Sequence, residues 1–181
     1  MTSPQRALII LDMINTFDFP GGAVLCRRAL PMAPAIARLK DRVKRGGGHC
    51  LYVNDNFSHW QSDFRELVAK AEAGPGRAIV ERLKPRDDDS FVLKPKHSAF
   101  FQTPLKLLLE QLQARTLILA GIAADACVLA TALDAHMHEF EVWAPSDCMA
   151  AMSDARKRAA LMVLKHSNID TRASNRARPR A

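Results

Sequence analysis

The feature that most constrains the fold of this chain is a repeated alternation between short apolar runs and amphipathic segments. The first run, residues 6–13, is apolar almost throughout and is closed by Asp12, as is typical of a strand buried on both faces. Strands that alternate with helices over short connections predict a parallel sheet, and right-handed crossovers place helices on both of its faces. We therefore expect an α/β protein, a three-layer Rossmann-like fold with about six parallel strands.

The other elements follow from the same patterns of apolar periodicity and turn residues. Further strands are expected at 49–54, 91–93, 116–120, 141–144 and 168–170. Helices are expected at 31–45, 58–73, 104–114, 125–137 and 153–166. The Pro-Gly-Gly of residues 17–22 predicts a loop, and the glycines of 46–48 and 74–76 end the helices before them.

Length and charge limit the classes of protein that the chain can belong to. Its 181 residues suffice for a single domain with a sizeable core, which we place at 1–170. Residues 171–181 hold four arginines and no acidic residue, and they predict a basic, flexible tail. No apolar run approaches the roughly 20 residues of a membrane helix, and no signal region precedes the first strand. A cytoplasmic protein without membrane contact is expected.

The net charge of +7 does not by itself predict a nucleic-acid partner. Part of it lies in the expected tail, and no basic patch is interleaved with aromatic residues that would stack on bases. Binding of an acidic partner by the tail stays open as a minor alternative. The chain also lacks a dinucleotide fingerprint and a P-loop, so no cofactor is expected. Its four cysteines contain no CxxC pair, which predicts reduced thiols rather than a disulfide framework or a cysteine zinc site.

Polar residues stand at or just past the ends of several predicted strands. Three of them, Asp12, Asp55 and Lys94, stand at or just past the ends of the first three predicted strands. The fourth, Cys127, lies at the start of the helix that follows the predicted strand at 116–120. Because ligands bind beyond the carboxyl ends of parallel strands, these side chains are expected to converge on one rim. The helix dipole and Lys94 would favour the Cys127 thiolate and lower its pKa below about 8.5.

Such a group of residues can perform acyl transfer. Asp12 would accept the thiol proton and pass it to a departing amine, while backbone N–H groups at the start of the cysteine's helix hold the oxyanion. From spacing alone, a structural ion pair between Asp12 and Lys94 beside a packed cysteine explains the residues equally well.

Three segments together carry a resemblance to a known family. They are ALIILDMINTF at 7–17, VLKPKHSAF at 92–100 with Thr103, and GIAADACVLAT at 121–131 with Asp134 and Ala135. The chain resembles the isochorismatase-like cysteine hydrolases, which include nicotinamidases, carbamoylsarcosine amidases and isochorismatases. The resemblance covers roughly residues 5–170 and implies a homo-oligomer, a dimer or a tetramer, that acts on a small-molecule substrate.

The resemblance also implies a role for particular residues. Asp12 matches the family's general acid/base, Lys94 its catalytic lysine and Cys127 its nucleophile. A cis peptide bond is expected between Ile122 and Ala123, and the N–H groups of Ala123 and Cys127 would form the oxyanion hole. The walls of the substrate pocket are expected to come from loops beyond the strand ends, with Phe17, Phe19, Asn56 and Trp60 as candidates, whereas Phe100 and Trp143 are expected to be core.

One departure from the family pattern bears on the chemistry. Nicotinamidases carry an Asp-x-His element that binds a metal, whereas residues 55–57 here read Asp-Asn-Phe, so no metal is expected. Retention of Cys127 favours hydrolysis of an amide, carbamoyl or related acyl compound, because cleavage of isochorismate, a vinyl ether, does not need a thiol. An isochorismatase-type vinyl-ether hydrolase and a catalytically silent binding or scaffold relative are the alternatives.

Overall fold

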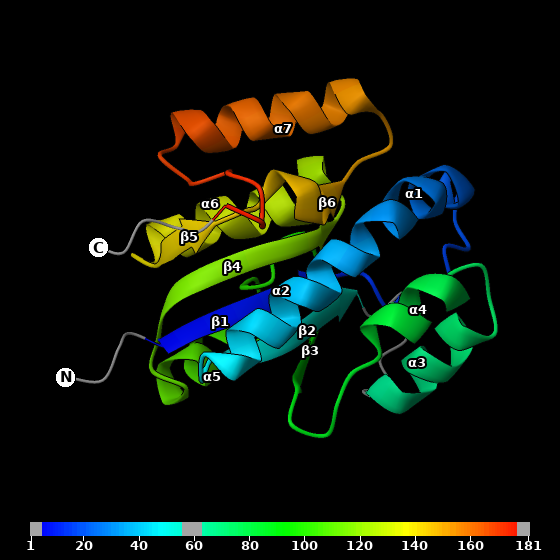
Figure 1. Ribbon diagram of the computed structural model, residues 1–181, viewed down its shortest axis with the longest axis horizontal. Helices are drawn as coiled ribbons and strands as arrows, with labels where there is room; N and C mark the ends of the chain where they lie inside the picture. The colour runs from blue at the N-terminus through cyan, green and yellow to red at the C-terminus, as the bar shows by residue number, and fades with distance from the viewer. Residues whose placement is uncertain (1–4, 56–62, 177–181) are drawn as a thin grey trace.

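The computed structural model describes residues 5–55 and 63–176 and contains a six-stranded parallel sheet. Its strands are β1 (Gln5–Leu11), β2 (His49–Asp55), β3 (Ser90–Lys94), β4 (Ala114–Ile122), β5 (Glu141–Trp143) and β6 (Met149–Ala150). The strand order is β3-β2-β1-β4-β5, and β6 pairs with the end of β4 (Figure 1). The predicted parallel sheet is confirmed.

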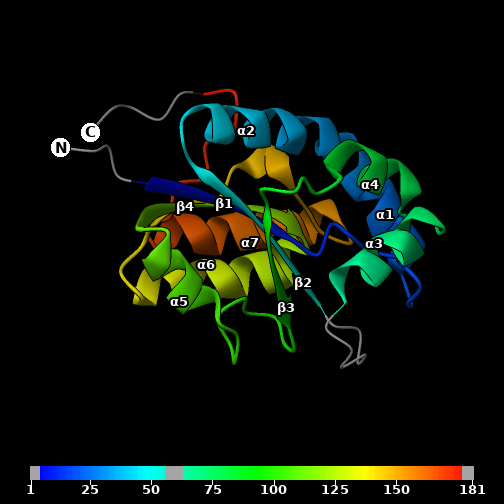
Figure 2. The same ribbon diagram turned by 90° about the horizontal axis from the view of Figure 1, so that it is seen from below.

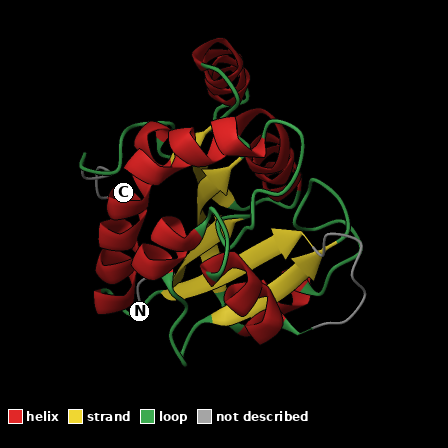
Figure 3. Cartoon of the chain, turned by 90° about the vertical axis from the view of Figure 1, so that its right-hand side faces the viewer, coloured by secondary structure: helices red, strands yellow, loops and turns green. Residues whose placement is uncertain are grey.

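Helices cover both faces of the sheet, as predicted (Figures 2 and 3). They are α1 (Gly22–Ala29), α2 (Ala33–Arg45), α3 (Phe64–Glu72), α4 (Arg77–Leu83), α5 (Leu105–Gln111), α6 (Leu129–Met137) and α7 (Asp154–His166). Helices α1 to α4 enclose one apolar core with one face of the sheet, and α5 to α7 enclose a second core with the other face. None of the described helices has the length and apolarity needed to cross a membrane.

Strand β1 lies at the centre of this arrangement. It pairs with β2 on one side and with β4 on the other. Alternate side chains enter opposite cores: Ile9 and Leu11 face the helices α5 to α7, and Leu8 and Ile10 face the helices α1 to α4. All four side chains are fully buried, which explains why the run lacks the polar alternation of a half-exposed strand.

Several predicted elements need correction. Residues 168–170 do not form a strand, because only an isolated bridge joins Trp143 to Asp170, and the sixth strand is the two-residue β6. The expected helix at 125–137 divides into a π-helical turn, η2 (Ala124–Val128), and α6. Two short helices were not predicted: α1, which precedes a 3₁₀ turn at Leu30–Met32, and α4, which follows Gly76. Within the described residues, the helix expected at 58–73 begins at Phe64.

A buried cluster of charged side chains around Asp89 holds β3, the strand that ends in Lys94, in position. The carboxylate of Asp89, just before β3, accepts hydrogen bonds from Lys40 at 2.5 Å, Lys44 at 2.6 Å and the backbone N–H of Arg86 at 2.7 Å. The Asp89 side chain is fully buried, and such a charge is tolerated only when it is paired in this way. The cluster ties α2 to the amino end of β3.

The segment expected to be a flexible tail is partly packed against the domain. Ser174 donates from its backbone N–H and its hydroxyl to Asp147, each at 2.6 Å, and Arg42 donates to the Ser174 carbonyl. The indole N–H of Trp143 donates to the carbonyl of Arg172 at 2.9 Å. The prediction of a flexible tail is therefore wrong for residues 171–176.

Candidate active site

The carboxyl ends of the strands bring together the side chains that the sequence singled out. Asp12 directly follows β1, Asp55 is the last residue of β2, and Lys94 is the last residue of β3. Cys127 lies in η2, the π-helical turn after β4. Because β1 lies between β2 and β4, residues from distant parts of the chain meet at this edge.

Lys94 is the centre of the group. Its side chain is fully buried, and its Nζ lies 3.0 Å from Asp12 Oδ2, 3.4 Å from Cys127 Sγ and 3.8 Å from Asp55 Oδ2. The same ammonium group donates to the carbonyl oxygen of Lys96 at 3.2 Å. A buried cation needs such partners, so Lys94 holds the carboxylate and the thiol close to each other.

Backbone interactions fix the position of Asp12. Its N–H donates to the carbonyl of Val53 at 3.0 Å, which continues the β1–β2 pairing for one residue. Its Oδ1 accepts the N–H of Asp55 at 2.7 Å, and its backbone has a left-handed φ of 54°. The left-handed turn ends the strand and leaves the Asp12 side chain, only 8% exposed, between Lys94 and Cys127.

Burial dominates the electrostatics of the site. Desolvation raises the pKa of Asp12, although Lys94 and a hydrogen bond from Cys127 oppose the rise. Desolvation and the neighbouring Asp12 carboxylate raise the pKa of Cys127 to about 12, against the opposite effect of Lys94. Burial alone would lower the pKa of Lys94, but Asp12 and Cys127 outweigh it and raise the value. The resting site therefore holds a thiol and an ammonium group, and the prediction of a depressed thiol pKa is wrong.

The turn that carries Cys127 begins where β4 touches β1. Gly121 has a φ of 124°, and a Cβ there would lie 2.1 Å from the carbonyl oxygen of Leu11. The next peptide bond, Ile122–Ala123, is cis, where the resemblance placed one. The carbonyl of Ala123 accepts the N–H groups of Ala126 at 3.0 Å and Val128 at 3.1 Å. Among the hydrogen bonds that the described chain makes outside its helices and strands, none is donated by the N–H of Ala123 or Cys127, and their role as an oxyanion hole stays a prediction.

Hydrogen bonds to α6 hold the loop that follows Lys94. The Ser98 hydroxyl donates to Asp134 Oδ2 at 2.5 Å, and the Ala99 N–H donates to Thr131 Oγ1 at 3.0 Å. The Thr103 hydroxyl donates to the Ala99 carbonyl at 2.5 Å. These residues belong to the second and third segments of the sequence resemblance, which the structure thus joins physically.

Sequence reasoning missed one residue beside the thiol. His97 Nδ1 lies 3.7 Å from Cys127 Sγ, within reach of a weak hydrogen bond to sulfur. The only signal in the sequence was its place three residues after Lys94, on the same loop. A loop histidine is ordinarily solvated, so this position in the sequence is by itself a weak signal.

The expected pocket walls are only partly described. Phe17 is 4% exposed and belongs to the core under α1 and α2, so it is a packing residue rather than a free wall. Phe19 is 38% exposed, with its ring centroid 6.4 Å from that of Phe17. Asn56 and Trp60 lie outside the described residues. Phe100 and Trp143 are buried, as expected of core residues.

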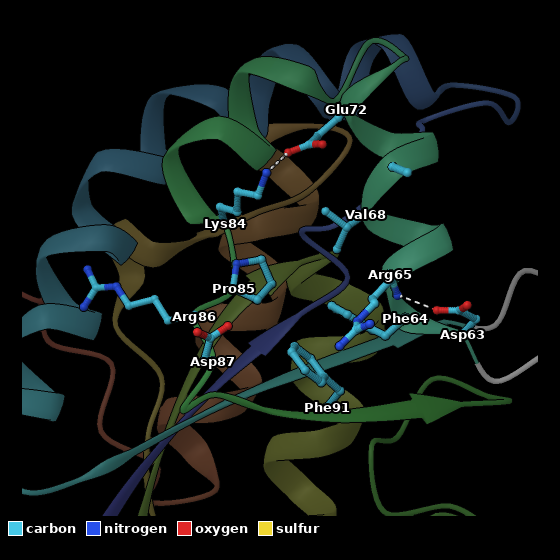
Figure 4. A pocket seen from close by; sticks show the side chains of 11 residues that line it. Asp63, Phe64, Arg65, Val68, Glu72, Lys84, Pro85, Arg86, Asp87 and Phe91 are labelled. Atoms are coloured by element: carbon cyan, nitrogen blue, oxygen red, sulfur yellow. Dashed lines mark hydrogen bonds and ion pairs between the residues drawn. The ribbon is translucent and has the colours of Figure 1, made fainter.

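A separate groove of about 990 Å³ lies beside α3 and the outer strand β3 (Figure 4). The stacked rings of Phe64 and Phe91 form its apolar part, with centroids 4.1 Å apart. At its rim, Lys84 pairs with Glu72 at 2.7 Å. It contains none of the groups around Cys127, and its charged side chains belong to the protein surface.

The donor set at the end of β2 does not fit the metal site of the nicotinamidases. Asp55 faces the ammonium group of Lys94, and the sequence continues with Asn56 and Phe57 in place of a histidine two residues on. Within residues 5–55 and 63–176, no group of three or more His, Cys, Asp or Glu side chains is arranged to hold an ion.

Comparison with known proteins agrees with this architecture. Residues 6–175 match the family described as the isochorismatase domain. The isochorismatase family protein YaaI of Bacillus subtilis (strain 168) is 37% identical over 166 residues, which cover 92% of each chain. The ureidoacrylate amidohydrolase RutB of Klebsiella pneumoniae subsp. pneumoniae is 36% identical over 163 residues, 75% of this chain and 69% of RutB. Enterobactin synthase component B of Escherichia coli (strain K12) is 27% identical, and the matched part is only 58% of that protein.

Solved structures share the fold. An isochorismatase family protein from Desulfovibrio vulgaris superposes with a TM-score of 0.78 at 24% identity and covers 95% of each chain. N-carbamoylsarcosine amidase from Thermoplasma acidophilum has a TM-score of 0.71 at 23% identity, over 96% of this chain and 98% of the amidase.

Proposed function

The chain belongs to the isochorismatase domain family, and from that premise we propose that this hydrolase cleaves a small amide, carbamoyl or related acyl compound through a thioester on Cys127. The proposal assigns Cys127 as the nucleophile, Asp12 as the general acid/base and Lys94 as the cation between them. No metal takes part in it.

One observation carries the proposal: a single buried ammonium group contacts both a carboxylate and a thiol. Lys94 Nζ lies 3.0 Å from Asp12 and 3.4 Å from Cys127 Sγ. A structural ion pair would satisfy Asp12 and Lys94 without the sulfur. Covalent hydrolysis needs all three groups, because the thiol must lose its proton and negative charge must then be stabilised.

The raised thiol pKa requires that deprotonation accompany attack. Asp12 accepts the proton from Cys127 as Sγ forms a bond to the substrate carbonyl carbon, and the charge moves to the carbonyl oxygen. The N–H groups of Ala123 and Cys127 hold this oxyanion, and Lys94 offsets the negative charge of the site. Asp12 then gives the proton to the leaving nitrogen, the C–N bond breaks, and the acyl group remains on sulfur.

The substrate class is supported by two considerations. RutB and N-carbamoylsarcosine amidase are named for acting on a ureido acid and on a carbamoyl amine, both with C–N bonds beside a carbonyl. The Asp-Asn-Phe at residues 55–57 lacks the histidine of the nicotinamidase metal element. A small linear amide or carbamoyl compound therefore fits better than nicotinamide.

A second candidate, vinyl-ether hydrolysis of the isochorismatase type, has one observation in its favour. The pKa of Cys127 is raised to about 12, and that of Asp12 is raised as well, which suits a carboxylic acid that protonates substrate without help from the thiol. In that chemistry Cys127 would be a packing residue.

Substitution of Cys127 separates the two candidates. Wild-type protein and the Cys127→Ala variant are assayed for ammonia release from a panel of amides, carbamoyl amines and ureido acids, and for hydrolysis of vinyl ethers. We expect Cys127→Ala to lose at least about 10³-fold in ammonia release, since the nucleophile is removed. Cys26→Ala, at a half-buried thiol on α1 that donates to the carbonyl of Pro75, is the control and should keep full activity. Vinyl-ether hydrolysis that persists in Cys127→Ala would contradict the proposal.

A further inference from the structure

The thiol of Cys127 has a third neighbour that the acylation step does not use. His97 Nδ1 lies 3.7 Å from Sγ, and the imidazole ring is exposed. Asp12 and Lys94, by contrast, are almost completely buried. The sulfur therefore lies between a buried carboxylate–ammonium pair and an imidazole that meets solvent.

The position of His97 is fixed from both sides along the chain. Before it, the carbonyl of Lys96 accepts a hydrogen bond from Lys94 Nζ at 3.2 Å. After it, the Ser98 hydroxyl is bound to Asp134 at 2.5 Å, and the next N–H is bound to Thr131. Two anchored neighbours hold the backbone of His97 over the thiol, which is how a site positions a proton-transfer group.

We propose that His97 is a further catalytic residue, the general base that activates water for hydrolysis of the Cys127 thioester. The inference rests on the proposed function, because it requires an acyl group on sulfur. The two carboxylate oxygens of Asp12 already contact Lys94 Nζ at 3.0 Å and the Asp55 N–H at 2.7 Å. The His97 ring, in contrast, is exposed to the water that must attack the thioester.

The step balances without an added reagent. The water oxygen attacks the thioester carbonyl carbon while one of its protons passes to the unprotonated Nδ1 of His97. The tetrahedral oxyanion collapses, the C–S bond breaks, and the sulfur leaves with the bonding electron pair. The imidazolium returns the proton to Sγ across the 3.7 Å contact, which regenerates the thiol and releases a carboxylic acid.

An activated ester separates the two half-reactions. p-Nitrophenyl acetate releases p-nitrophenolate on acylation, so a stopped-flow burst reports acylation and the later steady rate reports hydrolysis of the acyl-enzyme. In His97→Gln we expect a burst of undiminished amplitude followed by a steady rate that is lower by about 100-fold, the smaller end of general-base effects. His136→Gln, an exposed histidine on α6, is the matched control and should behave like wild type.

Chemical rescue distinguishes a proton-transfer role from a structural one. Once the imidazole-catalysed hydrolysis measured with Cys127→Ala is subtracted, added imidazole should restore a large part of the steady rate in His97→Gly and add nothing to that of wild type. The inference is overturned if His97→Gln keeps the wild-type steady rate, if its burst and steady rate fall together, or if imidazole restores nothing. Cys127→Ala is run in parallel. If ester hydrolysis by wild type does not depend on Cys127, the thioester function fails, and this inference fails with it.

Discussion

At the scale of single residues, the pKa values in the site are set by two opposed effects, burial of the side chains and the nearby charge of Lys94. Lys94 favours the charged forms of Asp12 and Cys127, but desolvation opposes them and has the larger effect on both pKa values. Asp12 also disfavours a second negative charge on the neighbouring sulfur. Asp12 and Cys127 therefore share one proton and one negative charge beside the Lys94 ammonium group, and the nucleophile forms only when Asp12 accepts the proton.

This balance has a measurable consequence for alkylation. Labelling of Cys127 by iodoacetamide should keep rising with pH well beyond about 8.5, because burial and Asp12 hold the pKa of the thiol near 12. Asp12→Asn should lower the apparent pKa, since it removes a negative neighbour. Lys94→Met should raise it, since it removes the cation. Mass spectrometry locates the adduct, and a Cys26→Ser background removes the half-buried competitor. Labelling that levels off below about 8.5 would contradict the account.

The residues at strand ends were predictable, but their protonation was not. Asp12, Lys94 and Cys127 each follow an apolar run, and parallel strands align such positions at one edge. The direction of the thiol pKa shift depends on how deeply the sulfur is buried and on its contact with Asp12. Neither quantity is encoded in spacing along the chain, and the same is true of the position of His97.

At the scale of elements, the close approach of β4 to β1 determines where the nucleophile lies. Gly121 contacts the backbone of Leu11, and η2 begins three residues later. A side chain at residue 121 would push the two strands apart and carry Cys127 away from Asp12. Glycine is needed here for both its positive φ and its lack of a Cβ.

Two glycine substitutions separate the requirement for a positive φ from the requirement for a residue without a Cβ. Gly121→Ala should lower the free energy of unfolding by at least about 3 kcal/mol, because left-handed strain adds to a clash with Leu11. Gly47→Ala places alanine at a positive φ of 78° in open space and should cost about 1–2 kcal/mol. Urea denaturation measures both. Equal losses would mean that the contact between β1 and β4 is not as close as described.

Long elements with strong patterns were predicted, and short ones were not. The apolar run of β1 and the Ser153 cap of α7 are local signals that the structure confirms. Strand β6 has two residues, and its pairing with the end of β4 is a tertiary contact that no local pattern contains. Helix α4 has seven residues and directly follows a Gly-Pro-Gly sequence. Glycine and proline are typical of turns, so the local pattern predicts a loop rather than a short helix there.

At the scale of the whole molecule, one sheet separates two apolar cores, and the active site lies at the carboxyl edge of the sheet, where strands from both halves of the chain end. The described part of the domain continues to Arg176, because Ser174 is bound to Asp147. The expected homo-oligomer, its cytoplasmic location and its small-molecule substrate stay predictions.

The most direct test of the central claim is to trap the acyl-enzyme. Wild-type protein is mixed with a substrate from the amide and carbamoyl panel, quenched in acid at times across a single turnover, and digested for mass spectrometry. We predict a transient mass gain on the peptide that contains Cys127, equal to the substrate minus its leaving amine and removed by hydroxylamine. Turnover of that substrate with no adduct on Cys127 at any time, and with activity retained in Cys127→Ala, would contradict the account.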